Sequence, residues 1–346
     1  AAVHLVSDVD PEPGEAQVRA GAERLARLDA DLVVAVGGGS VIDAAKAMRL
    51  LAEHPELTVR ELALPFLDPR KRVARFPQDP HTSRLIAVPT TAGTGSEVSP
   101  AAVLTVDGAK LTLVDYSLVP DQAIVEPRLT LTMPPVLTAD TGVDALTHAL
   151  EAYVSIFASP YTDALCVQAV RLILAALPRA HADGSDLAAR TDMANGATIA
   201  GLALANAFVG VNHALAHAVG ARFGIAHGRA NSLFLPSVLA YNAAVPTKFM
   251  PAPGYGAYVV PDKYAEMARA LGLGSTPEAL FERVADLLAG LGMPRSAADA
   301  GIDPAAYRAA LTELAGAAFA DLSLRTNPRM PLVDELRSLL EAVAGG

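Results

Sequence analysis

The pattern of apolar residues changes near residue 132, and this change constrains the fold more than any other feature of the sequence. Before it, short β-branched runs alternate with helical periods, which is typical of a parallel α/β sheet. After it, Ala- and Leu-rich helical periods punctuated by Pro and Gly continue to the C-terminal residue. We therefore predict two domains, an α/β domain over 1–132 and an all-α domain over 133–346.

The first domain can be divided further from its short apolar runs. Its candidate strands are 3–6, 32–36, 85–88, 103–106, 111–114 and 123–125. Helices are predicted over 16–28 and 41–52, where apolar residues recur at helical spacing. Two segments interrupt the pattern: 65–81 is a basic loop flanked by Pro, and 245–261 is rich in Pro, Gly and Tyr. We interpret both as insertions between elements of the scaffold.

Composition excludes several classes of partner. The 346 residues carry 37 acidic and 27 basic side chains, a net charge of −10 that disfavours nucleic acid and anionic membrane surfaces. The single cysteine, Cys166, lies in an apolar helical period and is predicted to be buried, which fits a reduced, cytoplasmic setting. Residues 193–221 contain no charged side chain and are long enough to span a membrane, but Asn and His interrupt them. We predict buried helices there, with no signal peptide and no membrane association.

A glycine-rich turn follows the predicted strand 32–36. Gly37, Gly38, Gly39 and Ser40 connect that strand to a helix start, although not with G-x-G-x-x-G spacing. Glycines let a backbone approach a phosphate closely, and the amides at a helix N-terminus attract its charge. Gly38, Gly39 and Ser40 are therefore predicted to bind a cofactor phosphate. The alternative is a tight turn in which Ser40 caps the helix.

A second polar turn follows the predicted strand 85–88. It gathers the hydroxyls of Thr90, Thr91 and Thr94, which suit phosphate and ribose oxygens, although an ordinary loop would also explain them. Open α/β sheets bind ligands where the carboxyl ends of strands meet, so two such turns predict a cofactor crevice. Lys110 could reach this crevice, or it could lie at a solvated strand end.

Histidines cluster in the helical half. Asp144 and His148 are four residues apart, as are His213 and His217, and His227 follows closely. Spacing of four places two side chains on one helix face. A lone core histidine is usually structural, but four histidines in three short apolar motifs, together with Asp144, point to a metal site. Three imidazoles and a carboxylate suit Zn²⁺ or Fe²⁺, with an open position for catalysis.

These motifs together resemble the iron-dependent, or group III, alcohol dehydrogenases. The matching segments are 37–40, 89–97, 142–153 and 213–228, in the family's order and spacing. Segments 61–72 and 327–332 are similar to ones in the alcohol dehydrogenase half of bifunctional aldehyde-alcohol dehydrogenases. The resemblance extends over nearly the whole chain.

The resemblance implies roles for particular residues. The metal ligands would be Asp144, His148, His213 and His227, and His217 would line the substrate site as a catalytic residue. The two turns and Lys110 would hold a nicotinamide cofactor, making the first domain nucleotide-binding and the second metal-binding. Because residues 3–13 look like the family's second strand and turn, we expect the first βα unit to be missing. That unit normally carries the carboxylate that reads the ribose, so NAD(H) is expected but NADP(H) is not excluded.

The sequence thus predicts a metal-dependent alcohol dehydrogenase that interconverts a small primary alcohol and its aldehyde, as a homo-oligomer of two or more subunits. One alternative is a metal- and nucleotide-dependent lyase of the dehydroquinate-synthase type. Such enzymes need many Lys and Arg around a polyanionic substrate, whereas the ligand motifs here are almost free of charge. The other alternative is an assembly subunit whose catalysis has lapsed, against which the intact ligand set argues.

Overall fold

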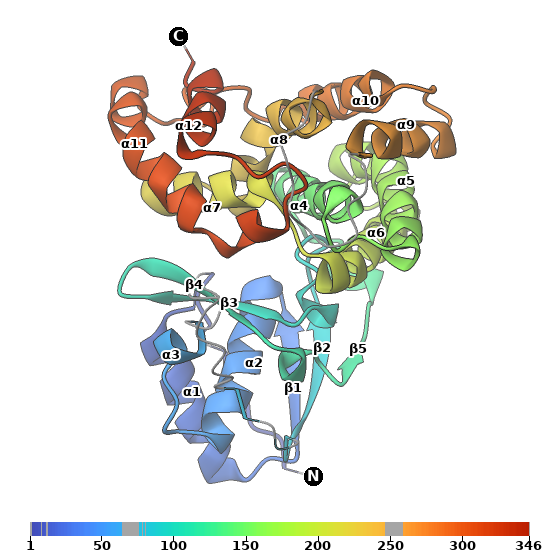
Figure 1. The fold of residues 1–346 in the computed structure, drawn as a ribbon. Helices are drawn as coiled ribbons and strands as arrows, with labels where there is room; N and C mark the ends of the chain where they lie inside the picture. Colours follow the sequence, from blue (N-terminus) through green and yellow to red (C-terminus); the bar gives the residue numbers. More distant parts are fainter. Residues whose placement is uncertain are drawn as a thin grey trace.

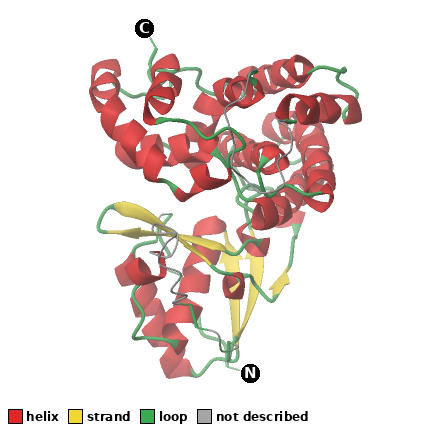
Figure 2. Cartoon of the chain, viewed as in Figure 1, coloured by secondary structure: helices red, strands yellow, loops and turns green. Residues whose placement is uncertain are grey.

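The computed structural model describes residues 2–7, 9–11, 13–63, 76, 77, 79, 81–245 and 259–345. Most of the two predicted insertions, 65–81 and 245–261, lies outside these residues. Every strand of the described chain belongs to the N-terminal part, and the C-terminal part is helical (Figures 1 and 2). The predicted fold class, a small parallel sheet followed by a helical domain, is confirmed. The position of the domain boundary at 132 stays a prediction.

A three-stranded parallel sheet forms the centre of the N-terminal part. Its order is β1 (Leu32–Gly37), β2 (Arg84–Pro89), β5 (Gln122–Ala123), so β2 is central. The register places Gly37 opposite Pro89, which brings the ends of β1 and β2 to the same edge. Two of the predicted helices are confirmed, as α1 (Glu15–Leu28) and α2 (Gly39–Glu53), and a short α3 (Val59–Ala63) follows.

The predicted strands 103–106 and 111–114 form, but outside the parallel sheet. They are β3 (Ala101–Val106) and β4 (Ala109–Val114), an antiparallel hairpin that forms a sheet of its own. Asp107 and Gly108 connect them with φ of 50° and 76°. Two successive positive φ values are typical of a hairpin turn whose twist matches that of its strands, and Asp-Gly favours it. The expectation of one parallel sheet from all candidate strands is therefore wrong.

The predicted strand at 3–6 is also wrong. Residues 2–7 have no strand conformation, and the side chains of Val3 and Leu5 are 91% and 77% exposed. A β-branched run forms a strand only when a neighbouring strand accepts its hydrogen bonds, and no described strand pairs with this segment. The last predicted strand, 123–125, is reduced to the two-residue β5.

Nine helices build the described C-terminal part, and they enclose two apolar cores. They are α4 (Pro135–Val154), α5 (Pro160–Ala182), α6 (Leu187–Ala207), α7 (Val211–Phe223), α8 (His227–Ala243), α9 (Val260–Ala270), α10 (Pro277–Gly290), α11 (Pro304–Ala320) and α12 (Val333–Ala342). The larger core joins α4, α5 and α6 to α9 and α10, and the second joins α7 and α8 to α11 and α12. Short 3₁₀ helices complete the chain at η2 (Ser96–Val98), η3 (Tyr116–Leu118), η4 (Pro127–Thr130) and η5 (Leu322–Thr326).

The uncharged stretch 193–221 is not one long helix. It divides into α6 and α7, whose axes differ by 106°. Among the described helices, one, α5, is long and apolar enough to cross a membrane, and the bent pair would make a second. In the structure α5 packs against α4 and α6, and its Cys166 is fully buried, as predicted. Such packing is that of a core helix.

Candidate functional site

The four predicted metal ligands lie together. Asp144 and His148 are one turn apart on α4, His213 is in the first turn of α7, and His227 begins α8. Their donor atoms all lie within 4.8 Å of one another. Asp144 Oδ1 is 3.6, 3.7 and 3.2 Å from the Nε2 atoms of His148, His213 and His227. A tetrahedral site with bonds of about 2.0–2.2 Å has donor separations of roughly 3.3–3.6 Å, so these residues fit a divalent ion.

Burial and charge tune this group of ligands. Burial lowers the pKa of His148 to about 4, against the opposing charge of Asp144. Burial raises the pKa of Asp144, but the charges of His148 and His227 and its hydrogen bonds hold it well below its usual value. A neutral imidazole and an ionised carboxylate are the forms that bind a metal, so both shifts favour coordination.

Two residues that the sequence reasoning missed support the ligands. Glu151 Oε2 lies 2.5 Å from His213 Nδ1, and its Oε1 accepts the backbone N–H of Asn212 at 2.7 Å. Asn231 donates its amide to Asp144 Oδ1 at 2.9 Å. A carboxylate partner fixes the ring orientation and tautomer of a metal-binding histidine, and an amide that donates to a ligating carboxylate holds that carboxylate in place. The signal that the sequence holds for them is helical spacing, because Glu151 follows His148 by three residues and Asn231 follows His227 by four.

The break between α6 and α7 is held rigidly. Phe208 has φ of 62° and ψ of −170°, a region that is nearly restricted to glycine. A Cβ on Gly210 would lie 2.5 Å from Asn327 Oδ1 and 2.9 Å from Glu151 Oε1, so only glycine fits there. The hydroxyl of Thr326 donates to the Val209 carbonyl. These contacts set the start of α7 and therefore the place of His213.

His217 lies beside the ligands without belonging to their group. Its ring stacks on His227 with centroids 5.1 Å apart and meets His213 edge-on at 5.9 Å. Its Nδ1 is 2.9 Å from Asp321 Oδ2, a partner that the sequence reasoning did not find. The side chain is 26% exposed, so His217 reaches solvent beside the ligands.

The two predicted cofactor turns meet as expected. A Cβ on Gly39 would lie 2.7 Å from the Thr94 side chain, and one on Gly38 would lie 3.4 Å from Thr91. Gly38 is the N-cap of α2, and within the described chain no side chain caps this helix. The alternative with Ser40 as the cap is therefore wrong, because Ser40 lies inside the first turn and its hydroxyl donates to the Pro11 carbonyl. The N-terminus of a helix without a side-chain cap can bind an anion, and the binding of a phosphate by these amides stays a prediction.

The second turn also contacts the helices of the metal site. Thr90 donates its N–H to Gly37 O at 2.9 Å, which ties the turn to β1. A Cβ on Gly93 would lie 2.6 Å from Thr141, one turn before Asp144 on α4. The candidate cofactor and metal sites are thus neighbours. Lys110 lies in β4 opposite Thr105, and its part in cofactor binding stays a prediction.

A buried lysine on α2 forms hydrogen bonds to the end of the second turn and to the residues that follow it. Lys46 on α2 donates to Ser96 Oγ at 3.1 Å and to the carbonyls of Ser99 and Ala101 at 2.9 and 2.7 Å. Its side chain is fully buried, and burial lowers its pKa to about 8 against the charge of Asp43, which lies 3.8 Å away. Asp43 also accepts the Ser96 hydroxyl and the Val103 N–H. One cation thus organises α2, η2 and β3 around the crevice.

Replacing Lys46 by methionine should destabilise the fold. It leaves the buried carboxylate of Asp43 without its cation and the carbonyls of Ser99 and Ala101 without the Lys46 donor, so the free energy of unfolding should fall by about 3–5 kcal/mol. Lys263→Met is the matched control, because Lys263 also binds an aspartate, Asp163, at 2.8 Å but that carboxylate is 32% exposed. Its effect should be near 1 kcal/mol or below. Denaturant unfolding measures both, and equal losses would contradict the assigned importance of Lys46.

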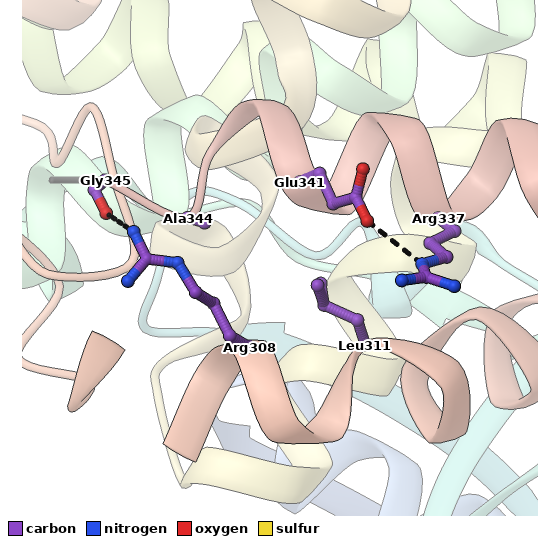
Figure 3. A pocket seen from close by; sticks show the side chains of 6 residues that line it. All are labelled: Arg308, Leu311, Arg337, Glu341, Ala344 and Gly345. Carbon is purple, nitrogen blue, oxygen red and sulfur yellow. Dashed lines mark hydrogen bonds and ion pairs between the residues drawn. The ribbon is translucent and has the colours of Figure 1, made fainter. Parts of the chain in front are cut away.

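A pocket of the described chain lies between α11 and α12 (Figure 3). Its cationic groups already have partners: Arg308 donates to the Gly345 carbonyl at 2.8 Å, and Arg337 binds Glu341 at 2.9 Å. None of the predicted site residues lines it. The candidate functional site therefore remains the ligand group and the adjoining turns.

Comparison with known proteins gives matches over almost the entire chain. Residues 1–127 match "Iron-containing alcohol dehydrogenase", and residues 138–344 match "Fe-containing alcohol dehydrogenase family, C-terminal". The aldehyde-alcohol dehydrogenase of Streptococcus pneumoniae serotype 2 is 43% identical over 344 residues, covering 97% of this chain and 39% of that protein. The NADPH-dependent butanol dehydrogenase of Clostridium saccharobutylicum is 35% identical, covering 99% of this chain and 84% of that protein.

A solved structure agrees with these matches. The iron-containing alcohol dehydrogenase of Thermococcus thioreducens superposes with a TM-score of 0.86 at 34% identity, covering 99% of this chain and 85% of that one. The chain spans about two fifths of the length of the bifunctional relatives. These relatives favour the alcohol dehydrogenase interpretation over the lyase alternative. The chain belongs to the iron-containing alcohol dehydrogenase family.

Proposed function

We propose that this chain is a metal-dependent alcohol dehydrogenase that interconverts a small primary alcohol and its aldehyde with a nicotinamide cofactor. The observation that carries the proposal is the adjacency of two sites. The four side chains that could bind a metal lie on α4, α7 and α8. The turn that contains Gly93 packs against α4 and belongs to the candidate cofactor crevice. A substrate oxygen at the metal would place its carbon beside the nicotinamide.

Asp144, His148, His213 and His227 are the proposed ligands of an Fe²⁺ or Zn²⁺ ion. When bound, such an ion supplies Lewis-acid chemistry, lowering the pKa of an alcohol so that it can give up a hydride. The chain's own residues prepare the site. Glu151 fixes the ring of His213, and Asn231 holds Asp144.

The cofactor is proposed to bind along the two turns. Its pyrophosphate would meet the amides of Gly38, Gly39 and Ser40, and Thr90, Thr91 and Thr94 would bind its remaining oxygens, with Lys110 as a further contact. NAD(H) is the first candidate. NADP(H) is the second, which the name of the butanol dehydrogenase relative supports.

The cellular compartment and the oligomeric state of the enzyme are also proposals. We expect a cytoplasmic homo-oligomer, since the buried free thiol of Cys166 suits a reducing compartment. The lyase alternative stays disfavoured. The intact geometry of the four donors argues against a lapsed assembly subunit.

Purified chain loaded separately with Fe²⁺ and Zn²⁺ tests the activity. With NADH or NADPH, acetaldehyde and longer aldehydes should be reduced, and the matching alcohols should be oxidised in reverse. The ratio of kcat/KM for the two cofactors measures the coenzyme preference. Failure to turn over any aldehyde with either cofactor and either metal, in protein that holds its metal, would remove the proposed function.

Replacing His217 by alanine should preserve metal binding and lower turnover. A positioned imidazole that relays the alcohol proton toward solvent contributes about 10²- to 10⁴-fold, and His217 is not needed to complete the four donors. His181→Ala, near the C-terminal end of α5, is the matched control and should change neither quantity. Metal stoichiometry and kcat are measured on the same preparations. Loss of metal from His217→Ala would make His217 a ligand instead.

A further inference from the structure

The histidine beside the metal group is held by a carboxylate from a distant part of the chain. Asp321 follows α11 and caps η5, 104 residues after His217. We propose that Asp321 is a positioning residue that fixes the tautomer of His217, leaving its Nε2 unprotonated and able to accept a proton. This proposal rests on the role of His217 in the proposed function.

The two oxygens of Asp321 have separate partners. Oδ2 lies 2.9 Å from His217 Nδ1, and Oδ1 accepts the backbone N–H of Ser323 at 2.7 Å. The cap fixes the rotation of the carboxylate, so Oδ2 is held toward the imidazole. A neutral imidazole carries one N–H, and the nitrogen that faces a carboxylate is the one that keeps it.

The charge state of Asp321 makes it an acceptor only. Burial raises its pKa, but the interaction with His217 and the hydrogen bonds from His217 and Ser323 outweigh burial and lower it to about 2. At neutral pH the ionised carboxylate can only accept hydrogen bonds. His217 therefore donates from Nδ1, and in its neutral ring the lone pair then lies on Nε2.

The same segment also fixes the helix that carries His217. Thr326 donates its hydroxyl to the Val209 carbonyl, and Asn327 Oδ1 accepts the N–H of Val211 at 3.1 Å. Residues 321–327 therefore hold both the start of α7 and the His217 ring six residues further along it. Within this segment, Asp321 determines which nitrogen of His217 carries the proton, whereas Thr326 and Asn327 determine where α7 begins.

Replacing Asp321 by asparagine should reverse the tautomer. If the asparagine oxygen keeps the cap on Ser323, its NH₂ group faces His217 Nδ1 and forces the ring proton to Nε2. In Zn²⁺-loaded protein with ¹⁵N-labelled histidine, the His217 nitrogen shifts should exchange their pattern. kcat should fall roughly 10²-fold, with metal content and the KM for cofactor unchanged. The double variant with His217→Ala should be no slower than His217→Ala.

Asp303→Asn is the matched control, because Asp303 caps α11 through the Ala306 N–H but faces no histidine. It should leave the His217 tautomer and kcat unchanged. A wild-type tautomer in Asp321→Asn would overturn the proposal, and so would a reversed tautomer with normal kcat. Normal turnover in His217→Ala would show that His217 has no part in catalysis, so the proposed role of His217 would fail and the role of Asp321 with it. The tautomer is measured separately from turnover, so this failure can be distinguished from a failure of Asp321 to set the tautomer.

Discussion

Replacing Asp144 by alanine should leave the purified chain without a stoichiometric divalent metal. Its Oδ1 lies 3.2 to 3.7 Å from all three imidazole nitrogens, so it is the one anionic donor common to the group. Without it, the three imidazole rings and the amide of Asn231 would remain around the site. Turnover should fall by about 10³-fold or more, since Lewis-acid assistance is worth several kcal/mol.

Asp163→Ala controls for the loss of an acidic residue, because Asp163 on α5 binds Lys263 and lies outside the metal group. That variant should keep full metal occupancy. Elemental analysis and a chelator competition measure occupancy and affinity. Equal occupancy in Asp144→Ala and wild type would show that the metal binds elsewhere.

Helical periodicity explains why the ligand set could be found from sequence. Spacing of four residues puts Asp144 and His148 on one face of α4, and this needs no tertiary information. The same periodicity contains Glu151 and Asn231, but acids and amides at helical spacing are common, so they stand out only after the histidines meet. Asp321 could not be found this way, because 104 residues separate it from His217 and only the packing of α11 on α7 brings them together.

The pairing of the strands could not be predicted from the sequence. A β-branched run predicts a strand but not its partner or direction, which depend on contacts distant in sequence. β3 and β4 became a hairpin through Asp107 and Gly108, whose turn preference was readable. The run 3–6 stays unpaired because none of the described strands lies beside it. Local preference was sufficient for α1 and α2, where one apolar face packs against the next helix.

Replacing Gly38 by valine should weaken cofactor binding without unfolding the protein. Gly38 has φ of −72° and ψ of −178°, which any residue adopts, and the nearest atom to a new Cβ is Thr91 Cγ2 at 3.4 Å. A Cβ at this position therefore displaces no neighbour. A pyrophosphate at the first turn of α2 would be displaced by the valine, because it must approach these amides within hydrogen-bond distance.

The KM for the nicotinamide cofactor should rise about 10- to 100-fold in Gly38→Val, equivalent to roughly 1.4–2.7 kcal/mol of lost binding. Gly38→Ala should give a smaller rise. Gly316→Val in α11 is the control, since nothing lies within 4 Å of its added Cβ, and it should leave the KM unchanged. Gly39→Val is a poorer test, because its side chain would strike Thr94 and separate the two turns. A wild-type KM in well-folded Gly38→Val would therefore place the pyrophosphate away from this helix, since crowding of the site by the valine is the only expected effect.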